Sequence, residues 1–172
     1  MRTLIISLPR TGSSSLLEKI SKEKNLKYVF EPFDGTNRWI YSENDDDVAV
    51  KTLIFDKPDN WKTNIDFYLD LSKQFNEIIL LSRKNLKECA ESWAYYRFIK
   101  DLTGKSLMEK YHWEMTSNFD QIYEKIITWD RELKTLSEKL NIPITYYEDI
   151  FDTSSQERYR SNISPKQSKT VL

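Results

Sequence analysis

Residues 3–17, TLIISLPRTGSSSLL, restrict the fold more than any other part of the sequence. The apolar run around Leu4, Ile5 and Ile6 is typical of a buried parallel strand. Residues 9–12 (PRTG) then break the pattern, and three serines begin a helix. A strand, a tight turn and a helix N-terminus together form an anion site, because the first amides of a helix are unpaired and its dipole favours negative charge.

Hydroxyl groups and one permanent cation strengthen this prediction. The candidate anion ligands of the loop are Arg10, Thr11, Gly12, Ser13, Ser14 and Ser15. The loop is not a Walker A motif, which needs G-x-x-x-x-G-K-[ST], because Ser7 stands five positions before the glycine and no lysine follows it. An ordinary strand–helix turn with a serine N-cap remains the alternative.

Composition sets limits on the class of protein. The length of 172 residues indicates one domain, 1–172, whose end at 153–172 is a polar, basic tail. A net charge of -1 provides no global field for nucleic acid or an anionic membrane. Cys89 is the only cysteine, which fits a reducing compartment, and no run approaches the roughly 20 apolar residues of a membrane span. We therefore expect a soluble cytoplasmic protein. The single histidine, His112, argues against a histidine-based metal cluster.

The alternation of apolar strands and amphipathic helices predicts an α/β fold. Strands are expected around residues 4–6 and at 27–30, 48–54, 77–82 and 142–147. Helices are expected at 13–24, 60–75, from about 85, and at 117–140. This order predicts three layers, with a central parallel sheet of about five strands and helices on both faces. The apolar stripe of the last helix favours packing across the sheet within one subunit; a coiled-coil homodimer is the alternative.

Charged residues lie at or near the ends of four of the predicted strands. They are Arg10, Glu31, Lys51 and Arg83. Because ligands of such sheets bind beyond the carboxyl ends of the strands, these side chains are expected to converge on one crevice. For Lys51 the alternative is a strand-end lysine that extends into solvent.

In this order the motifs resemble those of sulfotransferases that use 3′-phosphoadenosine 5′-phosphosulfate (PAPS), with carbohydrate-type members the most similar. Residues 7–16 (SLPRTGSSSL) resemble the loop that binds the 5′-phosphosulfate. Residues 80–85 (LLSRKN) with Ser92 and Trp93 resemble the 3′-phosphate motif. Residues 30–33 (FEPF) are similar to the segment that carries the base, and residues 146–149 (YYED) to a strand ending in Tyr-Glu-Asp. The resemblance implies a P-loop-like sulfotransferase architecture.

The resemblance also implies roles for single residues. Arg10 and Lys51 would stabilise charge on the sulfuryl and bridging oxygens. Arg83 and Ser92 would bind the 3′-phosphate, and Lys84 is a further candidate for that contact. Glu31 would be the general base, with His112 as its rival.

The function expected from the resemblance is sulfuryl transfer from PAPS to the hydroxyl of a small molecule or carbohydrate. The product would be adenosine 3′,5′-bisphosphate, and no metal is needed because side-chain cations take its place. We expect no nucleic-acid or membrane partner, and a monomer or homodimer. The alternatives are a P-loop-like nucleotide or small-molecule kinase and a degenerate, non-catalytic nucleotide-binding protein.

Overall fold

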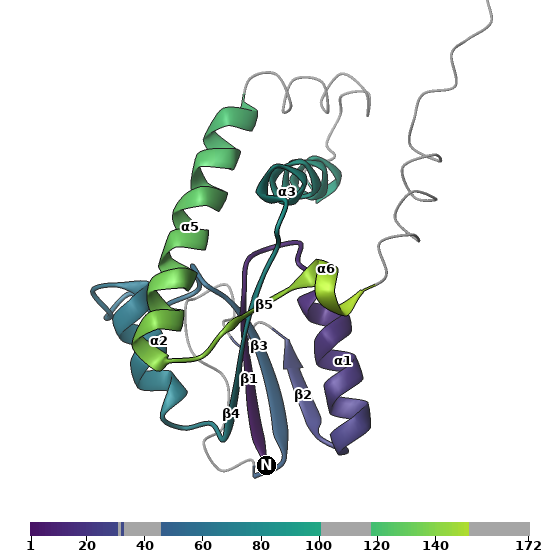
Figure 1. Ribbon diagram of the computed structural model, residues 1–172, viewed down its shortest axis with the longest axis vertical. Helices are drawn as coiled ribbons and strands as arrows, with labels where there is room; N and C mark the ends of the chain where they lie inside the picture. The colour runs from purple at the N-terminus through teal and green to yellow at the C-terminus, as the bar shows by residue number, and fades with distance from the viewer. Residues whose placement is uncertain (31, 33–45, 101–117, 152–172) are drawn as a thin grey trace, which may run out of the picture.

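The fold is built around one parallel sheet with helices on both of its faces (Figure 1). The computed structural model describes residues 1–30, 32, 46–100 and 118–151. Within them the strands are β1 (Arg2–Ser7), β2 (Lys27–Phe30), β3 (Val48–Leu53), β4 (Glu77–Ser82) and β5 (Ile144–Tyr146). The helices are α1 (Ser13–Lys24), α2 (Asn64–Ser72), α3 (Leu86–Lys100), α5 (Phe119–Leu140) and α6 (Tyr147–Ile150). The predicted α/β class and parallel sheet are confirmed.

The order of the strands creates a crevice at one edge of the sheet. The order is β2-β3-β1-β4-β5, and the strands pair in parallel. The chain passes from β1 outward to the edge strand β2 and later crosses to the other side of β1 to form β4. A parallel sheet whose winding direction reverses in this way has its ligand crevice at the carboxyl ends of the central strands. The segments after β1, β3 and β4 therefore border the same space.

Successive side chains of each strand point to opposite faces of the sheet, and helices bury both faces of the central strands β1 and β3. Leu4 and Ile6 of β1 belong to the larger core cluster, which α2, α3 and α5 cover. Ile5 belongs to the smaller cluster, covered by α1 and extended by Ile150 of α6. Figure 1 shows α1 and α5 on opposite sides of the sheet. This two-sided burial explains the continuous apolar runs of the central strands.

The long helix α5 packs within the chain, as the sequence favours. Ile122, Ile126, Leu133 and Leu136 are buried in the larger core cluster. The coiled-coil dimer stays an untested alternative. Among the helices of the described residues, none combines the length and the apolar composition that crossing a membrane would require.

The predicted limits of the second helix, 60–75, were wrong. Helix α2 begins at Asn64, because the hydroxyl of Thr63 accepts a hydrogen bond from the amide of Asp66 (N to Oγ1, 3.0 Å) and caps the first turn. It ends at Ser72, three residues earlier than expected.

The last strand is also shorter than predicted. β5 spans Ile144–Tyr146, and Tyr147 already begins the short helix α6. The amide of Phe151 donates to the carbonyl of Tyr147 at 3.0 Å and closes this turn. The acidic pair of the Tyr-Glu-Asp segment is thereby turned towards the β4–α3 connection, where Asp149 forms an ion pair with Lys84.

Candidate functional site

The loop between β1 and α1 is fixed by hydrogen bonds to its surroundings. The amide of Leu8 donates to the carbonyl of Leu81 at 3.1 Å, and the hydroxyl of Thr11 donates to the carbonyl of Leu8 at 2.8 Å. Between these two bonds Arg10 has a φ of 59°, in the left-handed region that residues other than glycine rarely adopt. Such strain persists only where the surroundings fix the backbone, and it is concentrated at ligand sites.

Helix α1 begins in the geometry of an anion site. Its N-cap is Gly12, with a φ of 69°, and no side chain caps it, so the serine N-cap considered as an alternative is wrong. The amide of Leu16 makes the first helical hydrogen bond, to the carbonyl of Gly12 at 3.0 Å. The amides of Ser13, Ser14 and Ser15 therefore lie outside the helical ladder, at the positive end of the helix dipole.

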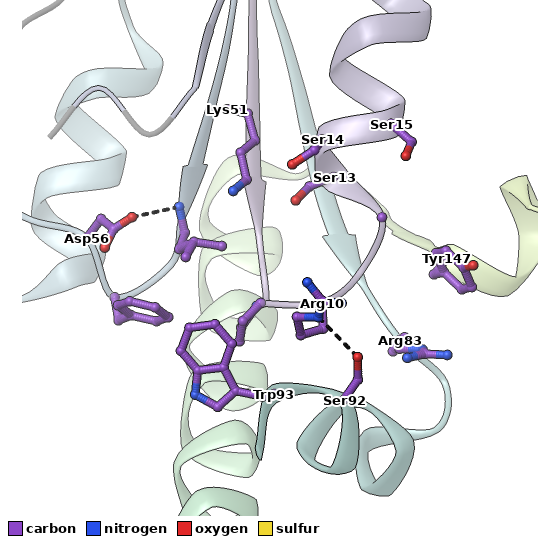
Figure 2. A pocket seen from close by; sticks show the side chains of 14 residues that line it. Arg10, Ser13, Ser14, Ser15, Lys51, Asp56, Arg83, Ser92, Trp93 and Tyr147 are labelled. Atoms are coloured by element: carbon purple, nitrogen blue, oxygen red, sulfur yellow. Dashed lines mark hydrogen bonds between the residues drawn. The ribbon is translucent and has the colours of Figure 1, made fainter. Parts of the chain in front are cut away.

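A cavity of about 580 Å³ lies at the carboxyl edge of the sheet (Figure 2). Its walls come from the segments after β1 and β4, the end of β3, and helices α1, α3 and α6. Its volume is in the range of small-molecule sites, roughly 300–1,000 Å³. The predicted site residues that line it are Arg10, Gly12, Ser13, Ser14, Ser15, Lys51, Arg83 and Ser92.

The structure does not bring every predicted residue into the cavity. The side chain of Thr11 is fully buried and its hydroxyl is bonded within the loop, so it is not part of the lining. Lys84 also does not line the cavity, and its ammonium group pairs with Asp149. Its share in a phosphate contact stays a prediction. Glu31 and His112 lie outside the described residues, and their roles stay predictions.

Lys51 is buried beside the loop, with 4% of its surface exposed. It lies on β3 opposite Ile5 of β1, so its neighbours on both sides are strands of the sheet. The alternative of a lysine that extends into solvent is therefore wrong. Figure 2 shows its ammonium group near Ser13 and Ser14, in the part of the cavity next to the start of α1. Its positive charge therefore lies at the wall of the cavity, where an anionic ligand could contact it.

Arg83 is held rigidly where β4 ends. It is 7% exposed. Its Nη2 lies 3.3 Å from a carboxylate oxygen of Glu88, and its Nε lies 3.6 Å from a carboxylate oxygen of Glu148. The guanidinium carbon is 4.8 Å from the centre of the Tyr147 ring. Contacts from α3 and α6 therefore fix the orientation of this cation before any ligand binds.

Arg10 connects the loop to helix α3. Its Nε donates to the hydroxyl of Ser92 at 3.1 Å (Figure 2). Arg10, expected to contact the sulfuryl group, is therefore in direct contact with Ser92, expected to bind the 3′-phosphate. Below them the thiol of Cys89 donates to the carbonyl of Pro9 at 3.0 Å. Burial raises the pKa of Cys89 to about 12, although the charges of Arg83 and Arg10 act in the opposite direction. The thiol therefore stays protonated and serves to anchor the loop.

The lining also includes six residues that the sequence did not assign to the site: Phe55, Asp56, Trp93, Tyr147, Pro9 and Leu53. The first two directly follow the end of β3, which is a signal that could have identified them, since loops after parallel strands border the crevice. Trp93 is next to the predicted ligand Ser92. Tyr147 belongs to the Tyr-Glu-Asp segment, but it was expected in a strand.

Positive charge predominates in the cavity. Among the described lining residues the cations are Arg10, Lys51 and Arg83, and the carboxylate is Asp56. Together with the helix N-terminus, these cations suit an anion that has several oxygen atoms. Within the described part of the chain, no group of three or more His, Cys, Asp or Glu side chains is placed to hold a metal ion.

No protein-family model matches the sequence, and no curated protein matches it.

Proposed function

We propose that the chain is a sulfotransferase that transfers a sulfuryl group from PAPS to a hydroxyl acceptor. The observation that carries the proposal is one cavity in which Arg10, Lys51 and Arg83 meet the N-terminus of α1. The cavity lies where the winding of the sheet reverses, the place where open α/β sheets bind nucleotides.

The chemistry of the lining fits a nucleotide with two separate anionic groups. The start of α1 offers amides, hydroxyls and a positive dipole, which suit the 5′-phosphosulfate. Arg83 lies on the opposite side of Arg10 from Lys51 in Figure 2, and its planar donors suit the 3′-phosphate. Ser92 lines the same cavity next to Arg10, and its hydroxyl can donate to the same ligand. Three cations from three different segments around one cavity therefore support a ligand with two anionic groups over a single phosphate.

Catalysis in this proposal depends on positioning and charge. Sulfuryl transfer resembles phosphoryl transfer, whose transition state is loose and gains most from oriented cations. Arg10 and Lys51 would stabilise the negative charge that develops on the departing and transferring oxygens. Glu31 is proposed as the base that removes the proton of the acceptor hydroxyl. It directly follows β2, whose last residue, Phe30, is paired with Lys51.

A calorimetric titration with three nucleotides tests the proposal. Adenosine 3′,5′-bisphosphate should bind more tightly than 5′-AMP, because only the former engages Arg83 as well as the loop. A kinase would instead prefer ATP with Mg²⁺, and a degenerate nucleotide-binding fold would bind none of the three.

Transfer itself is tested with PAPS labelled in the sulfuryl group and a panel of small-molecule and carbohydrate hydroxyl acceptors. Label recovered on any acceptor supports the proposal. Binding of the bisphosphate without transfer to any acceptor of the panel would instead indicate a protein that binds the nucleotide without catalysing transfer.

A further inference from the structure

The two halves of the cavity differ in chemistry. In Figure 2, Arg83 and Tyr147 lie on one side of the cavity and Asp56 lies on the other, with Lys51, Ser13, Ser14 and Arg10 between them. Trp93 lies on the same side as Asp56, and the ring of Phe55, the chain neighbour of Asp56, packs against it. The proposed donor uses the cationic half, which leaves the half with the aromatic rings and the carboxylate for a second molecule.

The position of Asp56 is set by the backbone around it. Its amide donates to the carbonyl of Leu53 at 2.8 Å, and one of its carboxylate oxygens accepts the amide of Leu53 at 3.2 Å. The buried hydroxyl of Tyr68 lies 2.6 Å from the carbonyl of Asp56 and 2.5 Å from that of Leu53. The turn is therefore rigid, and it places a half-buried carboxylate at the cavity wall. Asparagine could also accept the amide of Leu53, so the turn does not require the negative charge.

The aromatic wall beside Asp56 is also held in place. The Phe55 ring packs 4.2 Å, centre to centre, from that of Trp129 and 6.2 Å from that of Trp93. Trp129 belongs to α5 and Trp93 to α3, so three elements fix these rings. Fixed aromatic faces next to a polar group are typical of sites that bind a flat or ring-shaped molecule at one orientation.

The geometry points to an acceptor subsite formed by Phe55, Asp56 and Trp93 that selects a hydroxyl compound with a flat apolar face and a protonated amine. This inference rests on the proposed function, because the donor nucleotide must occupy the cationic part of the cavity for the acceptor to bind in the other part. The apolar face packs on the rings, and the ammonium group pairs with Asp56. An acceptor with a carboxylate in the same place would be repelled by Asp56 and is selected against.

The negative charge of the donor makes this selection compatible with the nearby lysine. Lys51 lies between Asp56 and the serines of α1 (Figure 2), and a bound phosphate group compensates its charge. Preference for an ammonium group is therefore expected to be stronger with adenosine 3′,5′-bisphosphate present than without it.

The test is a calorimetric comparison of three phenols that differ in one substituent: tyramine, 4-ethylphenol and 3-(4-hydroxyphenyl)propionate. With saturating bisphosphate, tyramine should bind roughly tenfold more tightly than 4-ethylphenol. This ratio corresponds to the weaker end of the range for hydrogen bonds to charged groups, because Asp56 is only half-buried. The propionate should bind most weakly. Asp56→Asn should abolish the difference between tyramine and 4-ethylphenol, while Asp59→Asn, an exposed residue nearby that does not line the cavity, should preserve it.

A measurement on the unaltered protein guards against an unfolded Asp56→Asn variant. Raising the salt concentration from about 0.05 to 0.5 M should reduce the preference for tyramine, because screening weakens the ion pair. Equal affinities for the three phenols, no binding of any of them, or a preference that survives Asp56→Asn would each overturn the inference. If the bisphosphate binds but the phenols show no preference, the acceptor inference fails and the proposed function stands. If tyramine is preferred but the bisphosphate does not bind, the proposed function fails.

Discussion

Gly12 lies against the ring of Tyr147 at a distance that leaves no room for a side chain. A Cβ on Gly12 would lie 2.7 Å from one ring carbon of Tyr147 and 3.0 Å from the ring of Phe151. The contact joins the start of α1 to α6, elements far apart in the sequence. The same Tyr147 ring also packs on Arg83, so one aromatic side chain connects the loop to the candidate 3′-phosphate ligand.

Gly12→Ala is expected to destabilise the protein by roughly 2–4 kcal/mol, the sum of left-handed backbone strain and overpacking against Tyr147. Urea unfolding measures the loss. The double variant Gly12→Ala, Tyr147→Ala separates the two causes. In the background without the Tyr147 ring, the alanine should cost less, mainly the backbone part of about 1–2 kcal/mol together with the remaining contact to Phe151. An equal cost in both backgrounds would show that the ring contact is not the reason for glycine at this position.

Arg83→Ala is expected to discriminate between ligands with and without a 3′-phosphate. It should weaken binding of adenosine 3′,5′-bisphosphate by roughly 1.5–3 kcal/mol, the range for hydrogen bonds to charged groups. Binding of adenosine 5′-phosphosulfate, which lacks the 3′-phosphate, should change little. Arg83 also contacts Glu88 and Glu148, so its removal could weaken the binding of both ligands by disturbing the site. The decisive quantity is therefore the ratio of the two affinities, in which such a common loss cancels. A similar loss for both ligands would contradict the assignment.

A third prediction concerns stability far from the cavity. Glu77 at the start of β4 accepts hydrogen bonds from Lys24 at 2.7 Å and from Thr3 at 2.8 Å. Burial raises the pKa of Glu77, but these bonds and the charge of Lys24 outweigh it and hold the pKa below its ordinary value. A carboxyl group with a lowered pKa in the folded state stabilises the fold above its unfolded pKa, and this contribution is lost as the pH falls through the folded pKa.

Lys24→Met should therefore lower the free energy of unfolding by about 0.5–1 kcal/mol at pH 7, a modest value because both side chains are about one third exposed. The difference from the unaltered protein should shrink below about pH 4, where the carboxyl group is protonated in the unfolded chain. Lys22→Met removes the same charge from an exposed position of the same helix, and serves as the control. A Lys24→Met effect that does not depend on pH would show that the ion pair is not its source.

The sequence predicted the sheet and the cationic edge because both follow from local patterns. Apolar runs identify buried strands, and parallel strands bring their carboxyl ends to one edge. Arg10 and Arg83 follow strands and Lys51 lies two residues before the end of β3, so the three could be grouped before their contacts were known.

The sequence did not predict contacts that depend on tertiary structure. Tyr147 continues an apolar, strand-like run, and only its packing on Gly12 and Arg83 accounts for its place in the cavity wall. Asp56 looks like an ordinary loop carboxylate, because the hydroxyl that fixes its turn comes from Tyr68, in the next helix. Short helices and turn geometry leave too little periodicity to be recognised from sequence alone.

The last prediction separates chemistry from binding, and it concerns Glu31. A base that acts only as the acceptor hydroxyl loses its proton contributes to the transition state and little to donor affinity. Glu31→Gln keeps the shape and the hydrogen-bonding capacity of the side chain but cannot accept the proton. We expect turnover with labelled PAPS to fall by about 10²–10⁴-fold, the usual contribution of a general base, while affinity for adenosine 3′,5′-bisphosphate stays within about twofold.

Glu23→Gln makes the same chemical change on the exposed side of α1 and should leave both quantities unaltered. If Glu31→Gln lowers turnover and nucleotide affinity together, the residue contributes to binding and not specifically to proton transfer. If turnover stays near that of the unaltered protein, Glu31 is not the base, and His112→Gln becomes the informative variant, because it removes the single histidine of the chain. The pH profile of the unaltered protein distinguishes the two candidate bases independently. Loss of activity on acidification should be centred near pH 6.5 for an ordinary histidine and near pH 4.3 for an ordinary glutamate, the pKa values of the unperturbed side chains.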